Sequence, residues 1–323
     1  MAKVYITDSL FASNDIEMNA LKARGHECVL IGTRDAAELV RQGADADALI
    51  VQFAPINDQV LDGMPNLKVM SRYGIGVDNF DLDSARRHGV VACNCPGYCL
   101  EEVAEHTLAF MLTSARQMIA VGENTRAGKW IVPGKSQPIL SLSGKTLGIV
   151  GFGAIARETA KRAAAFNMKL IAYDPYLKAS DAEQLKVEQV SLDQVWSRSD
   201  FITFHCPLTE ETRHMLNADT LAKTKRGVIV INNGRGGLID EAALLEALNS
   251  GHVGMAALDV LEQEPPPSDY ALLKHPNVLV TPHIASASEF SPGRLQEMAV
   301  AEIITVLDGK PALHPVGGTE KKA

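Results

Sequence analysis

The sequence predicts an α/β protein built from two parallel-sheet domains. Short apolar runs alternate with amphipathic stretches of helical length through almost the whole chain, as in parallel strands covered by helices on both faces. The chain has 323 residues, of which 46% are hydrophobic and 22% charged. This length suffices for two buried cores, and this composition is typical of a folded globular protein.

The charge, hydropathy and cysteine content of the chain disfavour several partners. The 31 Lys and Arg residues against 39 Asp and Glu give a net charge of −8, so no nucleic-acid partner is expected. No apolar run has the length of a membrane span and no secretory leader is evident, so we expect no membrane partner and a cytoplasmic location. The five cysteines are odd in number and lack zinc spacing, which predicts reduced packing thiols and no metal site.

Five short apolar runs predict the strands of a first α/β unit, with helical segments such as 16–24 and 82–88 between them. The segment 94–97 then breaks the pattern, and one long helix is predicted over about 101–118. The five predicted strands cover 4–7, 28–31, 48–51, 67–71 and 90–93.

A second unit begins at the apolar strand 147–150 and repeats strand then helix as far as 277–281. A last helix is predicted over about 294–307. The polar end 317–322 is expected to be frayed.

A glycine-rich run opens this second unit. Residues 151–156 read G-x-G-x-x-A, directly after the strand 147–150 and at the start of a helix. In such a run Gly151 permits the tight turn and Gly153 lets the backbone approach a pyrophosphate, which the helix N-terminus attracts. The segment therefore predicts a dinucleotide site.

Asp174 ends the next predicted strand, about 20 residues further on, where such sites carry an acidic residue. Its carboxylate would accept hydrogen bonds from the adenosine ribose and would repel a 2'-phosphate. NAD is therefore favoured over NADP. No complete P-loop and no G-x-S-x-G elbow is present, so the sequence gives no signal for an ATPase, a kinase or a serine hydrolase.

Arg235, Glu264 and His283 each follow the carboxyl end of a predicted strand in the second unit. Because the carboxyl ends of parallel strands share one edge, where ligands bind, we expect the three side chains to converge beside the dinucleotide. The three strands are 228–231, 255–258 and 278–280.

This trio suits hydride chemistry at a 2-oxo acid. Arg235 can bind a carboxylate and polarise the adjacent carbonyl through its planar guanidinium. His283 can donate a proton to the oxygen that becomes an alkoxide, which contributes ~10² to 10⁴ in rate, while Glu264 holds the imidazole. Taken singly, the three have plainer interpretations: a surface ion pair, a solvated loop residue and a helix cap.

On these residues the chain resembles the D-isomer-specific 2-hydroxyacid dehydrogenases, over about residues 45–310. The matching segments occur in order at 73–79, 102–106, 151–156, 205–209, 233–237, 259–265 and 281–283.

The resemblance implies roles for individual residues. Arg235, Glu264 and His283 would be catalytic. The implied substrate contacts are Arg72, Ile75, Gly76 and Val77. The implied NAD contacts are Gly151, Gly153, Ala154, Ile155, Asp174, Cys206, Pro207, Thr212, Asn233, Gly234, Arg235, Asp259, His283 and Ala285, with Asp259 expected at the nicotinamide amide.

The resemblance also implies the architecture and assembly. A Rossmann-like NAD-binding domain (99–289) would be inserted into a flavodoxin-like substrate domain (1–98 plus 290–323). A hinge would close the cleft, and a homodimer would be built largely on the segment after residue 100.

The start of the predicted long helix bears on the substrate. Cys99 and Glu102 stand where many members have asparagine and serine, and the segment is closer to a subgroup resembling the C-terminal-binding proteins. Three functions therefore remain open. One is an NAD-dependent enzyme acting on a small 2-oxo or D-2-hydroxy acid of the hydroxypyruvate, glyoxylate or phosphoglycerate kind. The second is an NAD(H)-sensing interaction protein, and the third is a Rossmann protein that binds another adenosine ligand.

Overall fold

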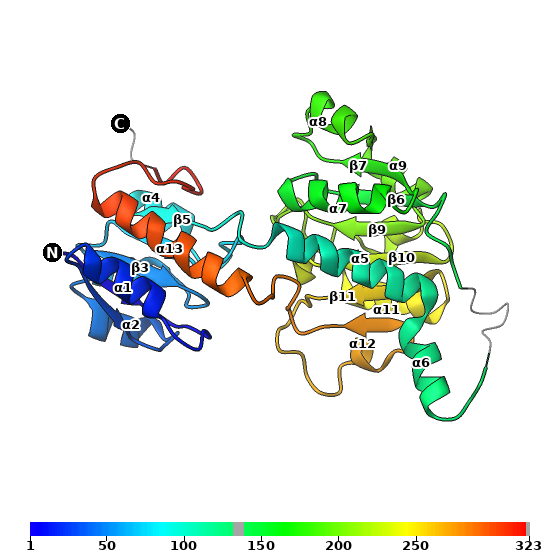
Figure 1. Cartoon of the computed structure of the whole chain (residues 1–323), viewed down its shortest axis with the longest axis horizontal. Coiled ribbons are helices and arrows are strands. Elements are labelled where there is room, and N and C mark those ends of the chain that lie inside the picture. Colours follow the sequence, from blue (N-terminus) through cyan, green and yellow to red (C-terminus); the bar gives the residue numbers. More distant parts are fainter. Residues whose placement is uncertain (132–138, 321–323) are drawn as a thin grey trace. The chain divides into compact units, whose positions relative to one another are not determined.

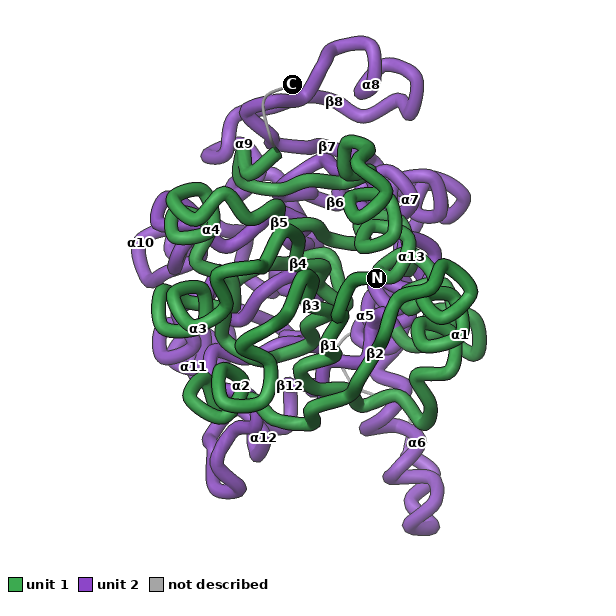
Figure 2. The backbone as a smooth tube through the Cα atoms, turned by 90° about the vertical axis from the view of Figure 1, so that its left-hand side faces the viewer, with its two compact units in different colours: residues 1–99, 287–323 green, residues 100–286 purple. Residues whose placement is uncertain are grey.

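The computed structural model describes residues 1–131 and 139–320, and the chain divides into two compact units. Unit 1 consists of residues 1–99 and the segment from 287 onward, and unit 2 consists of residues 100–286 (Figure 2). These divisions lie one and three residues from the predicted domain boundaries. Each unit contains a parallel sheet, so the predicted α/β class with one unit inserted into the other is confirmed.

Unit 1 is built on a five-stranded parallel sheet in the order β2-β1-β3-β4-β5. The order reverses between β1 and β3, which makes that pair the switch point of the sheet. Its strands are β1 (Lys3–Ile6), β2 (Glu27–Leu30), β3 (Ala48–Val51), β4 (Val69–Arg72) and β5 (Val91–Cys93). Its helices are α1 (Asp15–Ala23), α2 (Ala36–Gly43), α3 (Asp58–Gly63), α4 (Leu82–His88) and α13 (Ser291–Leu307).

The strands of unit 1 are apolar on both faces because both faces are covered by helices. Ala48 and Ile50 of β3 pack toward α1 and α13, which lie side by side (Figure 1). Leu49 and Val51 pack toward α2, α3 and α4. Helices α2, α3 and α4 begin at side chains that accept hydrogen bonds from backbone N–H groups of the first turn, which fixes where each starts.

Unit 2 is built on a seven-stranded parallel sheet in the order β12-β11-β10-β9-β6-β7-β8. The strands are β6 (Thr146–Val150), β7 (Lys169–Tyr173), β8 (Glu188–Gln189), β9 (Phe201–Phe204), β10 (Val228–Asn232), β11 (Val253–Leu258) and β12 (Val278–Val280). The helices are α5 (Leu100–Arg116), α6 (Met118–Arg126), α7 (Ala154–Ala164), α8 (Ala179–Gln184), α9 (Leu192–Arg198), α10 (Ala218–Leu221), the 3₁₀ turn η1 (Gly236–Leu238), α11 (Glu241–Asn249) and α12 (Ala271–Lys274).

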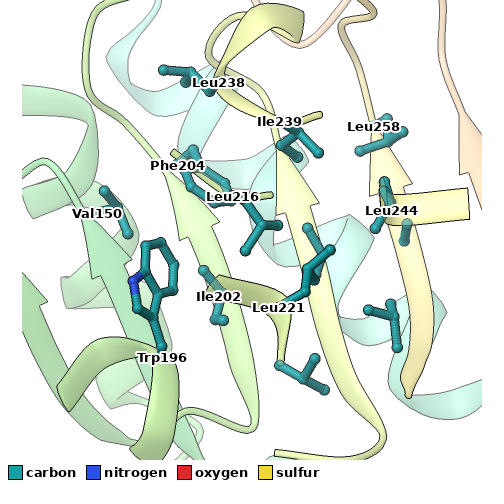
Figure 3. Packing of buried hydrophobic residues seen from close by; sticks show 14 of the residues in the cluster. Val150, Trp196, Ile202, Phe204, Leu216, Leu221, Leu238, Ile239, Leu244 and Leu258 are labelled. Carbon is teal, nitrogen blue, oxygen red and sulfur yellow. The ribbon is translucent and has the colours of Figure 1, made fainter. Parts of the chain in front are cut away.

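Two apolar cores sandwich this sheet. Helices α5 and α7 lie against one face, where small residues such as Ala156 and Ala160 allow close approach (Figure 1). Helices α9 to α12 cover the other face, where Trp196 lies among Val150, Ile202 and Phe204 (Figure 3). The sheet is thereby held rigid beneath the loops at its carboxyl edge.

One sequence-based prediction is confirmed and one is wrong. The long helix predicted over about 101–118 is α5, which ends where Gln117 takes a left-handed φ of 50° before the unpredicted helix α6. The polar end expected to fray is instead docked on unit 1 as far as residue 319. There the Thr319 side chain is buried and its Oγ1 accepts from the Ala92 N–H at 2.9 Å. Residues 321 and 322 of that prediction lie outside the described residues.

No helix within residues 1–131 and 139–320 combines the length and apolarity needed to cross a membrane. The five cysteines are free thiols. Cys93, Cys95 and Cys99 are buried, and Cys28 and Cys206 are partly buried.

Truncation of Trp196 should destabilise the protein more than truncation of any exposed aromatic residue. Trp196 is 1% exposed, so Trp196→Ala leaves a large cavity beneath the sheet and should lower the unfolding free energy by ~3 to 5 kcal/mol. Tyr176→Ala is the matched control, because Tyr176 is 90% exposed. Urea unfolding followed by circular dichroism measures both, and equal losses would contradict the assignment of Trp196 to the core.

Candidate active site

The carboxyl edge of the sheet in unit 2 gathers the trio predicted from the sequence. Arg235 follows β10, Glu264 lies in the loop after β11, and His283 follows β12. These three strands are neighbours and parallel, so their loops emerge side by side. Figure 1 shows the three strands in adjacent positions.

His283 and Glu264 form a direct hydrogen bond. The Nδ1 atom of His283 lies 2.7 Å from Oε2 of Glu264, and the other carboxylate oxygen accepts from the Leu261 N–H at 3.0 Å. Burial raises the pKa of the Glu264 carboxyl, but the hydrogen bond and charge of His283, the hydrogen bond from the Leu261 N–H and the charge of Arg235 hold the pKa below its ordinary value. An ionised Glu264 accepts from Nδ1–H, which leaves Nε2 of His283 as the atom that can exchange a proton with a ligand.

Arg235 is held by a loop that packs directly on the segment carrying Glu264. Asn232, the last residue of β10, accepts the Gly234 N–H at 3.0 Å and donates to the Arg235 carbonyl at 2.8 Å. The backbone of Gly236 lies so close to Leu261 and Glu262 that no Cβ would fit there. The two loops are therefore fixed to each other.

Asp259 fixes the segment that carries His283. This carboxylate is 1% exposed and accepts from Thr281 Oγ1 at 2.5 Å, from the Ile284 N–H at 2.9 Å and from the Ala285 N–H at 2.8 Å. The His283 N–H also bonds the Asp259 carbonyl at 2.9 Å, and His283 itself has a left-handed φ of 54°. Three hydrogen bonds to one charged group hold this unfavourable backbone conformation in place.

His106 of α5 extends this network and was missed by the sequence analysis. Its Nε2 lies 3.1 Å from Thr281 Oγ1. Because the Thr281 hydroxyl gives its hydrogen to Asp259, it can only accept from His106, which fixes the imidazole as the Nε2–H tautomer. Burial lowers the pKa of His106 despite the opposing effect of Asp259, so the ring is neutral at neutral pH.

The glycine-rich turn has the geometry of a dinucleotide cradle. Gly151 has a left-handed φ of 85°, and a Cβ there would strike the Cys206 backbone. A Cβ on Gly153, by contrast, would meet no protein atom within 4 Å, so the residue keeps space clear at the start of α7. Asp174 lies beside this turn, because its carboxylate accepts from the Phe152 and Tyr176 N–H groups at 2.7 Å each. The residues present therefore fit a dinucleotide.

The remaining predicted cofactor residues lie in the loops of the same edge. Ala154 and Ile155 open α7, and the loop after β9 is folded by Thr212, whose Oγ1 donates to the Pro207 carbonyl at 2.8 Å. Asn233 bonds Thr107 of α5 through its side chain at 2.9 Å. The edge thus also carries Cys206 after β9, Gly234 after β10 and Ala285 after β12. Their contacts with a cofactor stay predictions.

The predicted substrate residues Arg72, Ile75, Gly76 and Val77 lie in unit 1, at and after the carboxyl end of β4. This loop is tied to the end of β5. The Asn94 side chain donates to the Ile75 carbonyl at 2.6 Å, and the Cys95 N–H donates to the Gly74 carbonyl at 2.9 Å. Their role in substrate binding stays a prediction.

Comparison with known proteins places these residues in a described family. The profile of the D-isomer specific 2-hydroxyacid dehydrogenase NAD binding domain matches residues 108–285. A hydroxypyruvate reductase of Thermotoga maritima is 42% identical over 84% of this chain and 88% of its own length. A D-3-phosphoglycerate dehydrogenase of Archaeoglobus fulgidus is 39% identical over 86% of this chain, which spans only 53% of that relative's length.

A solved structure of D-lactate dehydrogenase from Aquifex aeolicus, complexed with NAD and lactic acid, superposes with a TM-score of 0.84 at 28% identity. The match covers 95% of this chain and 96% of the other. These relatives are named for dehydrogenase or reductase activity, and none of these matches supports the NAD(H)-sensing alternative.

The cradle predicts different outcomes for its two glycines. Gly153→Ala should change the unfolding free energy by less than ~1 kcal/mol, since its methyl meets no protein atom, and should weaken NADH binding at least about tenfold because the methyl takes the room of the pyrophosphate. Gly151→Ala should destabilise the fold itself. NADH fluorescence titration and thermal unfolding measure the two effects, and unchanged NADH affinity in Gly153→Ala would refute the cradle.

Proposed function

Because the chain belongs to the D-isomer specific 2-hydroxyacid dehydrogenase family, we propose that it is an NAD-dependent oxidoreductase acting at C2 of a small 2-oxo or D-2-hydroxy acid. The observation that carries this proposal is the 2.7 Å bond between His283 and Glu264 at the edge that also carries Arg235 and the glycine cradle. Acids of the hydroxypyruvate, glyoxylate or phosphoglycerate kind are the candidate substrates.

The proton chemistry follows from the His283–Glu264 pair. When bound, the nicotinamide supplies or accepts the hydride. In the reductive direction, protonated His283 gives the proton on Nε2 to the carbonyl oxygen of the substrate while Nδ1 stays bonded to Glu264. In the oxidative direction, neutral His283 takes the hydroxyl proton at the same atom.

Arg235 and the loop after β4 would orient the acid. The Arg235 guanidinium binds the substrate carboxylate and polarises the carbonyl beside it. The backbone N–H groups of Ile75, Gly76 and Val77, with Arg72, form a carboxylate site within unit 1. Unit 1 is thus the substrate domain and unit 2 the NAD domain in this proposal.

Asp174 would select the cofactor. Its carboxylate is positioned by the two backbone N–H groups of Phe152 and Tyr176, so its charge is fixed beside the turn. A fixed negative charge accepts hydrogen bonds from ribose hydroxyls and repels a 2'-phosphate. We therefore propose NAD rather than NADP as the cofactor used.

We also propose that the protein forms a homodimer through α6. Helix α6 has no buried residue and extends away from the rest of unit 2 (Figures 1 and 2). It exposes Met118 and Ile119, and Trp130 beyond it is 88% exposed. A cavity of about 490 Å³ with an apolar wall, including Leu140, Val253 and Met255, lies beside Ile119. A second copy would bury this apolar surface.

The free thiols support a reducing, cytoplasmic location.

Activity measurements test the proposed role of His283. The protein should oxidise NADH when given glyoxylate, hydroxypyruvate, pyruvate, 2-oxoglutarate or phosphohydroxypyruvate. His283→Gln should lower kcat by ~10² to 10⁴ while leaving NADH affinity nearly unchanged, because only the proton donor is lost. Glu264→Gln should lower kcat as well, because a neutral amide holds the Nδ1–H of His283 less firmly than the carboxylate does.

Stopped-flow turnover would measure these effects, with thermal unfolding as the control for folding. Full turnover in His283→Gln would remove His283 from the mechanism, and full turnover in Glu264→Gln would remove its partner.

The tautomer of His106 predicts how its replacements behave. His106→Leu removes the hydrogen bond to Thr281 and should lower kcat about 10- to 100-fold by loosening the loop of His283. His106→Gln keeps an amide N–H that can donate to Thr281, so it should retain most of the activity. Steady-state kinetics with hydroxypyruvate compares the two, and equal activities would show that the hydrogen bond has no such role.

The dimer proposal predicts a concentration-dependent assembly that α6 controls. Sedimentation velocity should give the mass of a dimer for the unaltered protein and that of a monomer for Ile119→Asp, because the charge cannot enter an apolar interface. A matched exposed change, Glu123→Gln, should keep the dimer, since it adds no charge to that surface. A monomeric unaltered protein would contradict the proposal.

A further inference from the structure

The switch point of the unit 1 sheet carries a second group of polar residues, outside the predicted substrate loop. Asp8 follows β1, Arg34 follows β2, and Gln52 and Phe53 follow β3. In open parallel sheets ligands bind outside the carboxyl ends of the strands at the switch point, which here lies between β1 and β3. These residues therefore occupy the place in unit 1 where a ligand is expected.

The buried carboxylate of Asp8 fixes the loops at this edge through hydrogen bonds. Asp8 is 6% exposed, and its carboxylate accepts from the Phe53 N–H at 3.0 Å and the Ala54 N–H at 3.2 Å. It also accepts from Arg34 Nε at 3.1 Å and from Thr7 Oγ1 at 2.8 Å. One buried charge therefore fixes the loop after β3 and the guanidinium of Arg34 together.

Arg34 is laid across an exposed aromatic ring. The centre of its guanidinium lies 4.4 Å from the centroid of Phe53, whose residue is 40% exposed. The Nε–H of Arg34 donates to Asp8. Among the described residues none accepts a hydrogen bond from either Nη atom of Arg34. The side chain is thus a preorganised fork whose outer N–H groups can bind a carboxylate or phosphate.

The residues around the Arg34 guanidinium include the apolar side chains of Phe53 and Leu10 and the side-chain amide of Gln52. Leu10 is 71% exposed, and its N–H holds the Gln52 side chain through Oε1 at 2.7 Å. The Gln52 amide N–H₂ is then directed to ligands or solvent. A site with one cation, one amide and apolar neighbours suits an anionic group at the end of a short carbon chain.

The loop that carries Phe53 and the proposed carboxylate loop follow neighbouring strands of this sheet. Strand β4, which leads into the proposed carboxylate loop, pairs directly with β3, which leads into Phe53. Because the guanidinium of Arg34 lies over Phe53, its outer N–H groups and the proposed carboxylate loop belong to the same edge of the sheet.

We propose that Arg34, fixed by Asp8 across Phe53, selects 2-oxo acids that carry a second anionic group at the far end. Arg34 is a specificity determinant and takes no part in proton or hydride transfer. This inference rests on the proposed function, since it assigns the far end of the same substrate.

The test compares Arg34→Gln with a matched control. Arg41→Gln removes another exposed arginine, on α2, that pairs with Glu38. Both variants and the unaltered protein are assayed with NADH and five acids. 2-Oxoglutarate carries a distal carboxylate and phosphohydroxypyruvate a distal phosphate. Hydroxypyruvate, pyruvate and glyoxylate have no distal charge.

The unaltered protein should use at least one of the two doubly anionic acids with a higher kcat/KM than any of the other three. Arg34→Gln should lower kcat/KM for that acid about 10- to 100-fold, mainly through KM, as expected for the loss of a charged hydrogen bond. Its values for hydroxypyruvate and pyruvate, and all values for Arg41→Gln, should stay within about twofold. Whether 2-oxoglutarate or phosphohydroxypyruvate responds identifies the anion as carboxylate or phosphate.

Each other outcome overturns the inference. Equal losses for all five acids in Arg34→Gln would indicate a structural role, and no loss for the doubly anionic acids would remove Arg34 from the site. A preference of the unaltered protein for uncharged far ends would also overturn it while leaving the proposed function intact. Absence of turnover with every acid in the unaltered protein would contradict the proposed function and this inference together.

Discussion

The buried carboxylate of Asp259 is the constraint on which the geometry of the candidate active site depends. Its oxygens bind one hydroxyl and two backbone N–H groups of a single short segment, and that segment carries His283 in a left-handed conformation. A buried carboxylate must be satisfied by such donors, and these hydrogen bonds offset both the cost of burying Asp259 and the cost of the left-handed backbone at His283. The position of the imidazole is thereby fixed before any ligand binds.

Unit 1 uses the same physical device at the corresponding edge of its own sheet. Asp8 follows β1 and, while buried, binds backbone N–H groups of the loop after β3. In both units an acidic residue at the end of one strand fixes the loop after a neighbouring strand. Loops built on parallel sheets carry the reactive groups, and these two carboxylates supply the rigidity that the loops themselves lack.

Much of the architecture and part of the candidate site could be predicted from the sequence. The alternation of apolar strands and amphipathic helices gave the two sheets, and the rule that strand ends share an edge brought Arg235, Glu264 and His283 to one place. The break between α5 and α6 at Gln117 could not be predicted, because a single residue with positive φ does not change the periodicity of the apolar residues. The role of His106 could not be predicted although it ends the matching segment 102–106, because no sequence pattern joins it to its partner Thr281, which lies far along the chain. The docking of Thr319 depends on β5, with which it shares no local pattern.

The most direct measurement of the central claim is a crystal structure of the protein with NAD and a D-2-hydroxy acid bound. The account predicts that Nε2 of His283 lies ~2.6 to 3.2 Å from the C2 hydroxyl oxygen, with Nδ1 still bonded to Glu264 and Arg235 on the substrate carboxylate. A ligand bound with its C2 hydroxyl out of reach of His283 would contradict it.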